Sequence, residues 1–386
     1  MYEILKNRAL ELKSRIAGSG LDAILLTDED SIAYVAGFWG YLGVEFGRPT
    51  MVIVPANGEC IVITPLMELE MSSQMTWITD VRPWEDGKNG EWRTVLQKAV
   101  SDLKLNNVGI EKLKVPPLVG EFLTGSFGRS DVAFQDCTRL IGEMRLIKSP
   151  EEIAIMRQAG EVAIAMVEGG KAALAEGVPE YEIALAVIAS GTRKAAGFLT
   201  DKGFDQFVSP TIHNLQVLQS GHDTSKVHRR SNVRRLRQGD PVYMCFCGMV
   251  NFKQYKLGFD REFFIGSVTD EQARIYEVAV AAQLAALNTI RPGVIAEDVH
   301  LAANEVYRAA GFDPGYRTGR AVGCSFLEMP EFKTGDKTVI QAGMTFAVDG
   351  GITIPNEYGA RVGDSIVVTA SGFEYLTPYP KDLCVI

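Results

Sequence analysis

The sequence predicts two domains, an α/β domain over residues 1–142 and an α+β domain over residues 143–386. Three observations lead to this fold class. Helical and strand patterns alternate over the first 140 residues, which is typical of an α/β domain. A strong helix start then follows at Ser149–Glu152, and two helix–helix–strand blocks succeed each other to the end of the chain. The two blocks indicate an internal pseudo-two-fold duplication, although their sequences are too dissimilar to show a repeat directly.

The first domain opens with an amphipathic helix predicted over Leu5–Ala17. Short apolar runs bounded by turn residues predict its strands, which follow in the order Asp22–Leu26, Thr50–Val54, Glu59–Thr64 and Val108–Ile110. The turn Pro55–Gly58 separates the second and third of these runs, so we expect them to form a β-hairpin.

The second domain begins at a helix N-terminus with three separate signals. Ser149 is a capping residue, Pro150 occupies the first helical position, and Glu152 stands three residues after the cap. Four helices are predicted in this domain, over Glu151–Ala175, Glu180–Ala196, about 270–290 and about 296–310. Strands follow each helix pair.

The overall composition is that of an ordinary globular protein, with 46% hydrophobic and 23% charged residues. The net charge of −9 argues against general nucleic-acid binding, although a basic run lies at Lys226–Arg237. This run is interpreted as a solvated or subunit-facing stretch. The N-terminal helix is charged, and no apolar run approaches ~18 residues. We therefore expect a cytoplasmic protein that contacts no membrane.

The six cysteines are scattered without the spacing of a disulfide framework. Cys245 and Cys247 are two residues apart, so a strand would place them on one face. A thiolate metal site requires four convergent ligands, and the neighbouring sequence offers none. Both residues are interpreted as buried small hydrophobic side chains.

Several segments together resemble the pita-bread family, which includes aminopeptidase P, prolidase, methionine aminopeptidase and creatinase. The segments are Arg145–Glu152, Gly239–Gly266, Arg291–Gly293, Gly343–Met344 and Asp364–Thr369. The resemblance covers nearly the whole chain and includes the small N-terminal domain that prolidase and creatinase share. It implies a pita-bread fold for the second domain.

The metallopeptidases of this family bind two metal ions through two Asp, one His and two Glu. The resemblance places those five positions at Cys245, Gly258, Arg320, Asp349 and Gly363. Glycine supplies no ligand and arginine does not lose its proton, so only Asp349 could coordinate an ion. The resemblance therefore predicts no metal site and no cofactor, and classical two-metal peptidase activity is not expected.

Creatinase is the branch of the family that works without metal, and five residues match its site. His228 lies where creatinase has its catalytic histidine, and Asp260 and Asp349 lie where it has two glutamates that hold the guanidinium group. Phe46 and Arg48 reproduce the segment that clamps the substrate carboxylate across the dimer interface. The resemblance thus implies a homodimer with shared sites.

Each of these matches also has a purely structural interpretation. An exposed histidine, an Asp–Arg salt bridge, a turn-forming Asp349 and a subunit contact of Arg48 would account for them. The chain also departs from creatinase, because both glutamates are replaced by the shorter aspartate. Arg320 and Arg361 enter the core region and are added as substrate-binding candidates. Creatine itself is therefore not the expected substrate.

The remaining polar residues predict a small zwitterionic substrate. Asp260 and Asp349 would bind its cationic end and Arg48 its carboxylate. With His228 as general acid–base catalyst, the expected activity is metal-independent, creatinase-like hydrolysis of a non-peptide C–N bond in an amidino, guanidino or cyclic amidine compound. Three alternatives stay open: a lyase acting on an osmolyte zwitterion, a noncatalytic pita-bread module that binds a small ligand or a protein, and a mononuclear-metal hydrolase that uses Asp349, His228 and Cys245.

Overall fold

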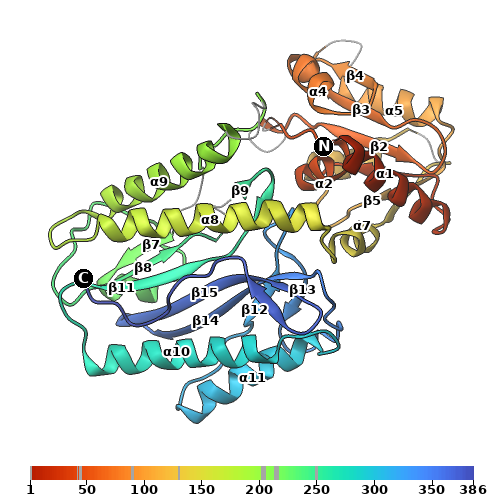
Figure 1. The fold of residues 1–386 in the computed structure, drawn as a ribbon. Helices are drawn as coiled ribbons and strands as arrows, with labels where there is room; N and C mark the ends of the chain where they lie inside the picture. The colour runs from red at the N-terminus through yellow and green to blue at the C-terminus, as the bar shows by residue number, and fades with distance from the viewer. Residues whose placement is uncertain are drawn as a thin grey trace. The chain divides into compact units, whose positions relative to one another are not determined.

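The computed structural model describes residues 2–40, 42, 46–87, 91–128, 131–200, 206–212, 217–247 and 251–386. The chain folds as two compact units, Met1–Met144 and Arg145–Ile386. The boundary predicted from the sequence lies between residues 142 and 143. The predicted fold class, an α/β unit followed by a pita-bread unit, is confirmed (Figure 1).

The first unit is built on a mixed six-stranded sheet in the order β4-β3-β2-β1-β5-β6. Its strands are β1 (Ala23–Leu26), β2 (Met51–Pro55), β3 (Ile61–Pro65), β4 (Asp80–Trp84), β5 (Asn107–Ile110) and β6 (Ala133–Asp136). Strands β2 and β3 pair antiparallel with Met51 opposite Ile63, so the predicted hairpin is confirmed. Strand β1 pairs parallel with β5, and this parallel pairing continues to β6.

Helices cover this sheet and bury its apolar side chains. They are α1 (Tyr2–Ala17), α2 (Glu29–Ala36), α4 (Leu69–Met75), α5 (Trp92–Asp102), α6 (Pro117–Glu121) and α7 (Thr138–Arg145), with the short turns η1 (Leu66–Glu68) and η2 (Phe122–Ser126). Leu25, Ile53 and Leu96 are fully or almost fully buried in one cluster between sheet and helices. Helix α2 begins where the Asp28 side chain accepts a hydrogen bond from the backbone N–H of Ser31 at 3.1 Å.

The second unit contains an antiparallel sheet in the order β13-β12-β14-β15-β11-β8-β7, with β16 paired to β15. The strands are β7 (Val217–Ser220), β8 (Pro241–Cys245), β11 (Asp260–Phe264), β12 (Gly319–Ala321), β13 (Glu328–Phe332), β14 (Thr345–Ile354), β15 (Tyr358–Val368) and β16 (Phe373–Tyr375). A small ribbon of β9 (Asn251–Phe252) and β10 (Tyr255–Lys256) lies apart from this sheet.

The helices of this unit precede the strands in two matching pairs. Helices α8 (Pro150–Ala172) and α9 (Glu180–Thr200) come before β7, β8 and β11. Helices α10 (Asp270–Thr289) and α11 (Ala296–Ala309) come before β12, β14 and β15. The first block supplies the neighbouring strands β7, β8 and β11, the second supplies β12 to β16, and the blocks meet where β15 pairs with β11. This arrangement agrees with the predicted pseudo-two-fold duplication.

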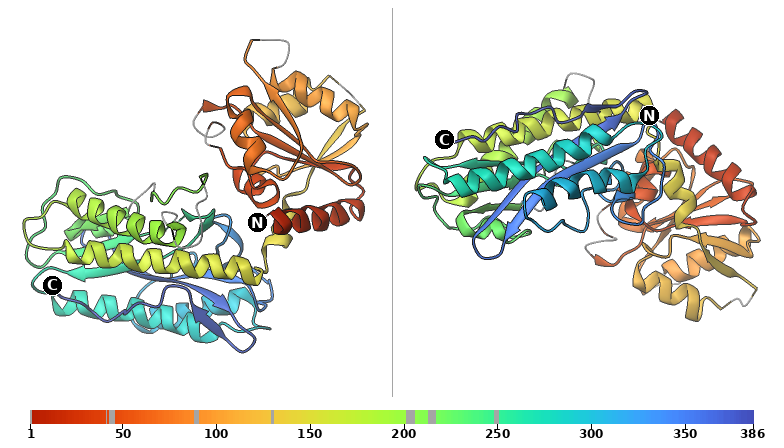
Figure 2. Two further views of the ribbon diagram at one scale, coloured as in Figure 1. Left: turned by 45° about the horizontal axis from the view of Figure 1, so that its top comes forward. Right: turned by 90° about the horizontal axis from the view of Figure 1, so that it is seen from below.

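Both helix pairs cover the same face of the sheet. On β8, Met244 lies so close to α8 that a Cβ atom on Gly170 would be 2.6 Å from its sulfur. Arg261 pairs with Met244 in the strand register, so both side chains lie on the same face. Arg261 forms an ion pair with Asp364 at 2.8 Å, and Gln283 of α10 donates a hydrogen bond to Asp364 at 3.1 Å. Figures 1 and 2 show α8 and α10 running along the strands. Residues that alternate with these point to the opposite face.

The segment at the start of α8 is held by buried charges. The predicted capping box of Ser149 and Glu152 is confirmed, with both of its hydrogen bonds present. Just before it, Lys148 forms an ion pair with Glu328 at 2.8 Å, and both side chains are almost completely buried. Burial raises the pKa of Glu328, but the charges of Lys148 and Arg145 outweigh this effect, so its pKa is lowered.

No helix among the described residues is long and apolar enough to cross a membrane.

Replacing Glu328 by Gln should destabilise the second unit by roughly 3–5 kcal/mol, because the Lys148 charge would stay buried without its partner. Since the folded-state pKa of Glu328 lies below its unfolded value, its stabilisation is present above the unfolded pKa. That stabilisation is lost as the pH falls through the folded pKa. Urea unfolding of wild type and Glu328→Gln across the acid range measures both effects.

The matched control is Glu271→Gln, which removes an exposed ion pair with Arg274 and should leave the unfolding midpoint unchanged. Equal midpoints for Glu328→Gln and wild type at neutral pH would contradict the importance of the buried pair.

Candidate functional site

A row of four residues crosses the second sheet on the face that α8 and α10 do not cover, here called the open face, and three of them (Cys245, Asp260 and Gly363) are buried. The strand register pairs Cys245 with Asp260, Asp260 with Gly363, and Gly363 with Asp349. Paired residues of antiparallel strands have their side chains on the same face of the sheet. The row therefore lies on the face opposite α8 and α10, where it draws on β8, β11, β15 and β14.

Two thiols surround the carboxylate of Asp260. The Cys247 thiol lies 3.3 Å from Asp260 Oδ1, and the backbone N–H of Cys247 lies 3.4 Å from Cys245 Sγ. Both sulfurs and a carboxylate oxygen of Asp260 lie within 4.8 Å of one another. Cys245 is buried in an apolar cluster as expected, and the β8–β11 register also brings the Asp260 carboxylate, which is distant in sequence, to both cysteines.

Arg320 supplies a buried cation next to the row. Its guanidinium donates to Asp349 Oδ2 at 2.8 Å, and its Cζ lies 4.2 Å above the ring of Phe326. Arg320 Nε and Asp349 Oδ1 are buried and have no hydrogen-bond partner among the described residues. These two atoms keep hydrogen-bonding capacity for a bound molecule.

The glycine in the row allows the two carboxylates to approach each other. A Cβ atom on Gly363 would lie 2.7 Å from Asp260 Oδ2 and 2.9 Å from Asp349 Oδ1. Any larger residue would collide with both oxygens. Burial, together with the negative charge of Asp349, raises the pKa of Asp260 to about 6. The site therefore holds a carboxyl group that changes protonation close to neutral pH.

Glu262 is a further buried carboxyl group that the sequence reasoning missed. It lies two residues after Asp260 on β11, so its side chain shares the face of the row. Burial raises the pKa of Glu262 to about 8, although its Oε2 accepts a hydrogen bond from the backbone N–H of Arg361 at 3.1 Å. Its Oε1 is buried without a partner among the described residues. The two-residue spacing from Asp260 on a predicted strand would have indicated that Glu262 lies on the same face.

These residues do not fit the two-ion site of the metallopeptidases that the sequence resembles. A Cβ atom on Gly258 would lie 2.6 Å from Ala347 Cβ and 3.2 Å from Arg320 Nη2, so neighbouring atoms occupy the place of a ligand side chain. A side chain at Gly363 would meet the carboxylates of Asp260 and Asp349. The guanidinium of Arg320 repels a metal ion and has no free electron pair to donate.

A single ion, in contrast, fits the donor atoms that are present. Cys245, Cys247 and Asp260 bring two sulfur atoms and one carboxylate oxygen within 4.8 Å of one another, and zinc accepts both kinds of donor. Among the five family positions the resemblance left Asp349 as the possible ligand, and this cluster adds Cys245, Cys247 and Asp260 as candidate ligands.

Arg361 does not join the row. Its guanidinium donates to Thr353 Oγ1 at 2.7 Å and to the carbonyl of Ala360 at 3.1 Å. Both partners belong to the β14–β15 hairpin. Arg361 nevertheless lies two residues before Gly363 on β15, on the face of the row, so its substrate-binding role stays a prediction. Asp260, Asp349 and Arg320 lie close together, as expected.

His228 lies in a turn that follows η3 (Gly221–Ser225), and it is exposed. The turn η3 packs against the start of β15, where the backbone N–H of Gly359 donates to Thr224 Oγ1 at 3.1 Å. Gly359 and Gly363 share one face of β15, so η3 borders the face of the row. The structure records no hydrogen bond from the His228 imidazole to the row. A catalytic role for His228 stays a prediction.

Phe46 and Arg48 belong to the first unit. Arg48 forms an ion pair with Asp86 at 2.7 Å, and 41% of its side chain is exposed. Phe46 is also exposed, at 64%. The predicted homodimer in which these residues reach a neighbouring site stays a prediction.

The chain is similar over nearly its whole length to proteins that are named either as a cyclase or as a dipeptidase. Agropine synthesis cyclase of Rhizobium rhizogenes is 27% identical over 397 residues, covering 98% of this chain and 96% of the relative. "Putative dipeptidase YkvY" of Bacillus subtilis is 26% identical over 384 residues, covering 98% and 100%. The structure of an Xaa-Pro dipeptidase from Bacillus anthracis superposes with a TM-score of 0.82 at 23% identity and covers 99% and 100% of the two chains.

These comparisons contradict the expected metal-independent, creatinase-like hydrolysis of a non-peptide C–N bond. The comparisons also conflict with the expectation against classical two-metal peptidase activity, because these relatives are named as dipeptidases. The residue types at five separate positions carry no information about the strand register that brings Cys247 and Asp260 close to Cys245.

The family assignment rests on two matches. Residues 8–147 match the creatinase/prolidase N-terminal domain, and residues 154–370 match metallopeptidase family M24, which is more than half of the chain. Together with the two-unit fold and the row of residues on the open face of its second sheet, these matches show that the chain belongs to metallopeptidase family M24.

Proposed function

We propose that the protein hydrolyses the peptide bond of dipeptides. The observation that supports this most directly is the row itself, in which two carboxylates and one buried guanidinium lie on the open face of a sheet. A dipeptide is a zwitterion, so its ammonium group would pair with Asp260 or Asp349 and its carboxylate with Arg320. The full-length similarity to a protein named as a dipeptidase supports the same substrate class.

The residues of the row would divide the work between binding and activation. The ion pair with Arg320 holds Asp349 Oδ2, which leaves Oδ1 free to accept a hydrogen bond from the substrate. Cys245, Cys247 and Asp260 would hold a single divalent ion, which when bound supplies Lewis-acid activation of a carbonyl or of water. The thiolates required for binding would form by loss of protons when the ion binds.

A second candidate function is ring closure within a substrate. The cyclase from Rhizobium rhizogenes matches 98% of this chain, so the similarity includes both units and the row. Cyclisation would join a nucleophile of the substrate to its own carboxyl carbon, and the carboxyl oxygen would leave as water, whereas hydrolysis adds water to the peptide carbonyl. Arg320 would then stabilise negative charge on the carbonyl oxygen.

Product mass separates the two functions. Incubation with a panel of dipeptides that includes Xaa-Pro compounds should give free amino acids, whose summed mass exceeds that of the substrate by one water. Ring closure would lower the substrate mass by one water instead. Asp260→Asn should lower kcat/KM by at least about 100-fold, since it removes a carboxylate that positions the reacting groups.

The matched control for that variant is Glu374→Gln, which lies in an exposed ion pair with Arg157 and should keep wild-type activity. Unchanged dipeptides after incubation with added Zn²⁺, Co²⁺ or Mn²⁺ would rule out the proposed hydrolysis.

Cobalt binding tests the thiolate donors independently of activity. Titration of the metal-free protein with Co²⁺ should produce a near-ultraviolet thiolate-to-cobalt absorption band with a stoichiometry of one ion per chain. Cys245→Ser and Cys247→Ser should each weaken or abolish the band. The control is Cys60→Ser, which replaces a buried cysteine of the first unit and should leave the band unchanged. A wild-type protein without this band would disprove the single-ion site.

The role of His228 is tested by measuring turnover and substrate affinity separately in a His228→Ala variant. If its imidazole moves protons during the reaction, His228→Ala should lose turnover by about 10²–10⁴-fold while substrate affinity is largely kept. Single-turnover kinetics and equilibrium dialysis of the same dipeptide measure the two quantities. Wild-type rates in this variant would remove His228 from the mechanism.

A further inference from the structure

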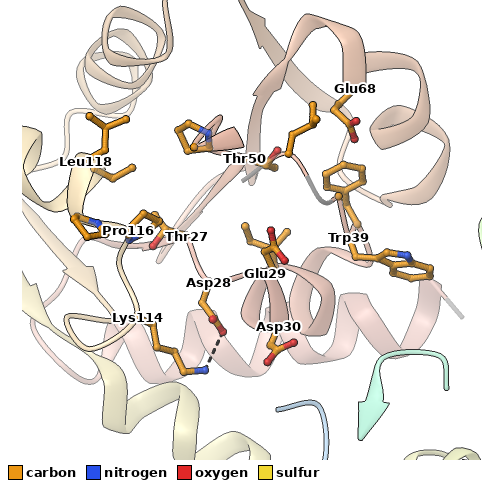
Figure 3. A pocket seen from close by; sticks show the side chains of 18 residues that line it. Thr27, Asp28, Glu29, Asp30, Trp39, Thr50, Glu68, Lys114, Pro116 and Leu118 are labelled. Carbon is orange, nitrogen blue, oxygen red and sulfur yellow. Dashed lines mark hydrogen bonds and ion pairs between the residues drawn. The ribbon is translucent and has the colours of Figure 1, made fainter. Parts of the chain in front are cut away.

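The first unit contains a cavity of ≈ 580 Å³ that is separate from the row in the second unit (Figure 3). This volume lies within the range of small-molecule sites. Much of its wall is apolar and comes from Phe38, Trp39, Pro116 and Leu118. Figure 3 shows Trp39 and Glu68 on one side of the cavity and Pro116 and Leu118 on the other.

Glu68 is the unusual residue of this cavity. Only 8% of it is exposed, and its Oε2 has no hydrogen-bond partner among the described residues. A Cβ atom on Gly40 would lie 3.0 Å from this oxygen and 3.0 Å from Phe38 Cζ. The carboxylate and the aromatic ring therefore border the same small space. A buried carboxylate oxygen without a partner is costly, and a bound donor would remove that cost.

A second unsatisfied polar atom lies on the opposite side. Thr27 Oγ1 is buried without a partner among the described residues, and Figure 3 shows Thr27 beside Pro116, away from Glu68. The cavity thus offers one buried carboxylate and one buried hydroxyl, separated by apolar surface.

The charge of the lining residues is negative. Asp28, Glu29, Asp30 and Glu68 are acidic, and Lys114 is the one cation among the residues that line the cavity. Lys114 is already paired with Asp28 at 2.9 Å. The balance therefore favours a cationic ligand and disfavours an anion.

We propose that this cavity binds a small organic ammonium ion with an apolar or aromatic body. The ammonium group donates to Glu68 Oε2 beside the aromatic rings of Phe38 and Trp39, whose faces also attract cations. The body lies against Pro116 and Leu118. A hydrogen-bonding group at the far end reaches Thr27 Oγ1. This site lies outside the row and does not depend on the proposed dipeptidase activity.

Calorimetry with three compounds that share a 4-hydroxyphenylethyl body tests the proposal on the full-length protein. Tyramine carries an ammonium group, tyrosol replaces it with a neutral hydroxyl, and 3-(4-hydroxyphenyl)propionate carries an anion. Tyramine should bind at least tenfold more tightly than tyrosol, and the propionate should not bind. Equal affinities for tyramine and tyrosol, or no tyramine binding at millimolar concentration, would overturn the proposal.

Variants assign the binding to this cavity. Glu68→Gln keeps the size of the side chain and should weaken tyramine binding at least tenfold, whereas Glu70→Gln, an exposed residue of the neighbouring α4, should not. If Glu68→Gln is unfolded, Gly40→Ala serves instead, because its methyl group would crowd Glu68 Oε2. Asp260→Asn should bind tyramine like wild type. Loss of binding in Asp260→Asn with wild-type affinity in the first-unit variant would place the ammonium site in the row and refute the proposal.

Discussion

The antiparallel register of β8, β11, β15 and β14 is the constraint on which the site depends. Each strand contributes one residue to the row, and a shift of one position in any strand would turn that residue toward the helices. Interactions on the covered face hold this register. Arg261 of β11 binds Asp364 of β15, and Gln283 of α10 binds the same carboxylate. The buried pair beneath the sheet therefore positions the polar residues on its open face, which explains why such charged groups occur in an otherwise apolar layer.

Arg320 and the glycines determine which chemistry this member of the family can carry out. Gly363 brings the carboxylates of Asp260 and Asp349 together, and Arg320 compensates part of their charge. Without that guanidinium, two buried carboxylates at this separation would repel each other. With it, a two-ion site does not fit, and the single ion proposed above would bind to Cys245, Cys247 and Asp260. The proposed groups for the ion and for the substrate therefore include neighbouring residues of the row.

Much of the fold could be predicted from local sequence patterns. The start of α8 follows from Ser149, Pro150 and Glu152, because capping is a local interaction among neighbouring residues. The hairpin of β2 and β3 follows from two apolar runs separated by a short turn. The site was predicted less completely. Asp260, Asp349 and Arg320 were identified and do converge, but Arg361 is held by the β14–β15 hairpin, and the roles of Cys247 and Glu262 were missed.

The sequence by itself determined the order of the predicted helices and strands and the two-domain organisation. These properties depend on residue type and on contacts between near neighbours. Only the tertiary structure decided that two thiols meet Asp260, that Arg320 neutralises Asp349, and that Glu68 faces a cavity without a partner. Those features arise from strand register and side-chain packing between segments far apart in the chain, where residue type alone carries no information about distance.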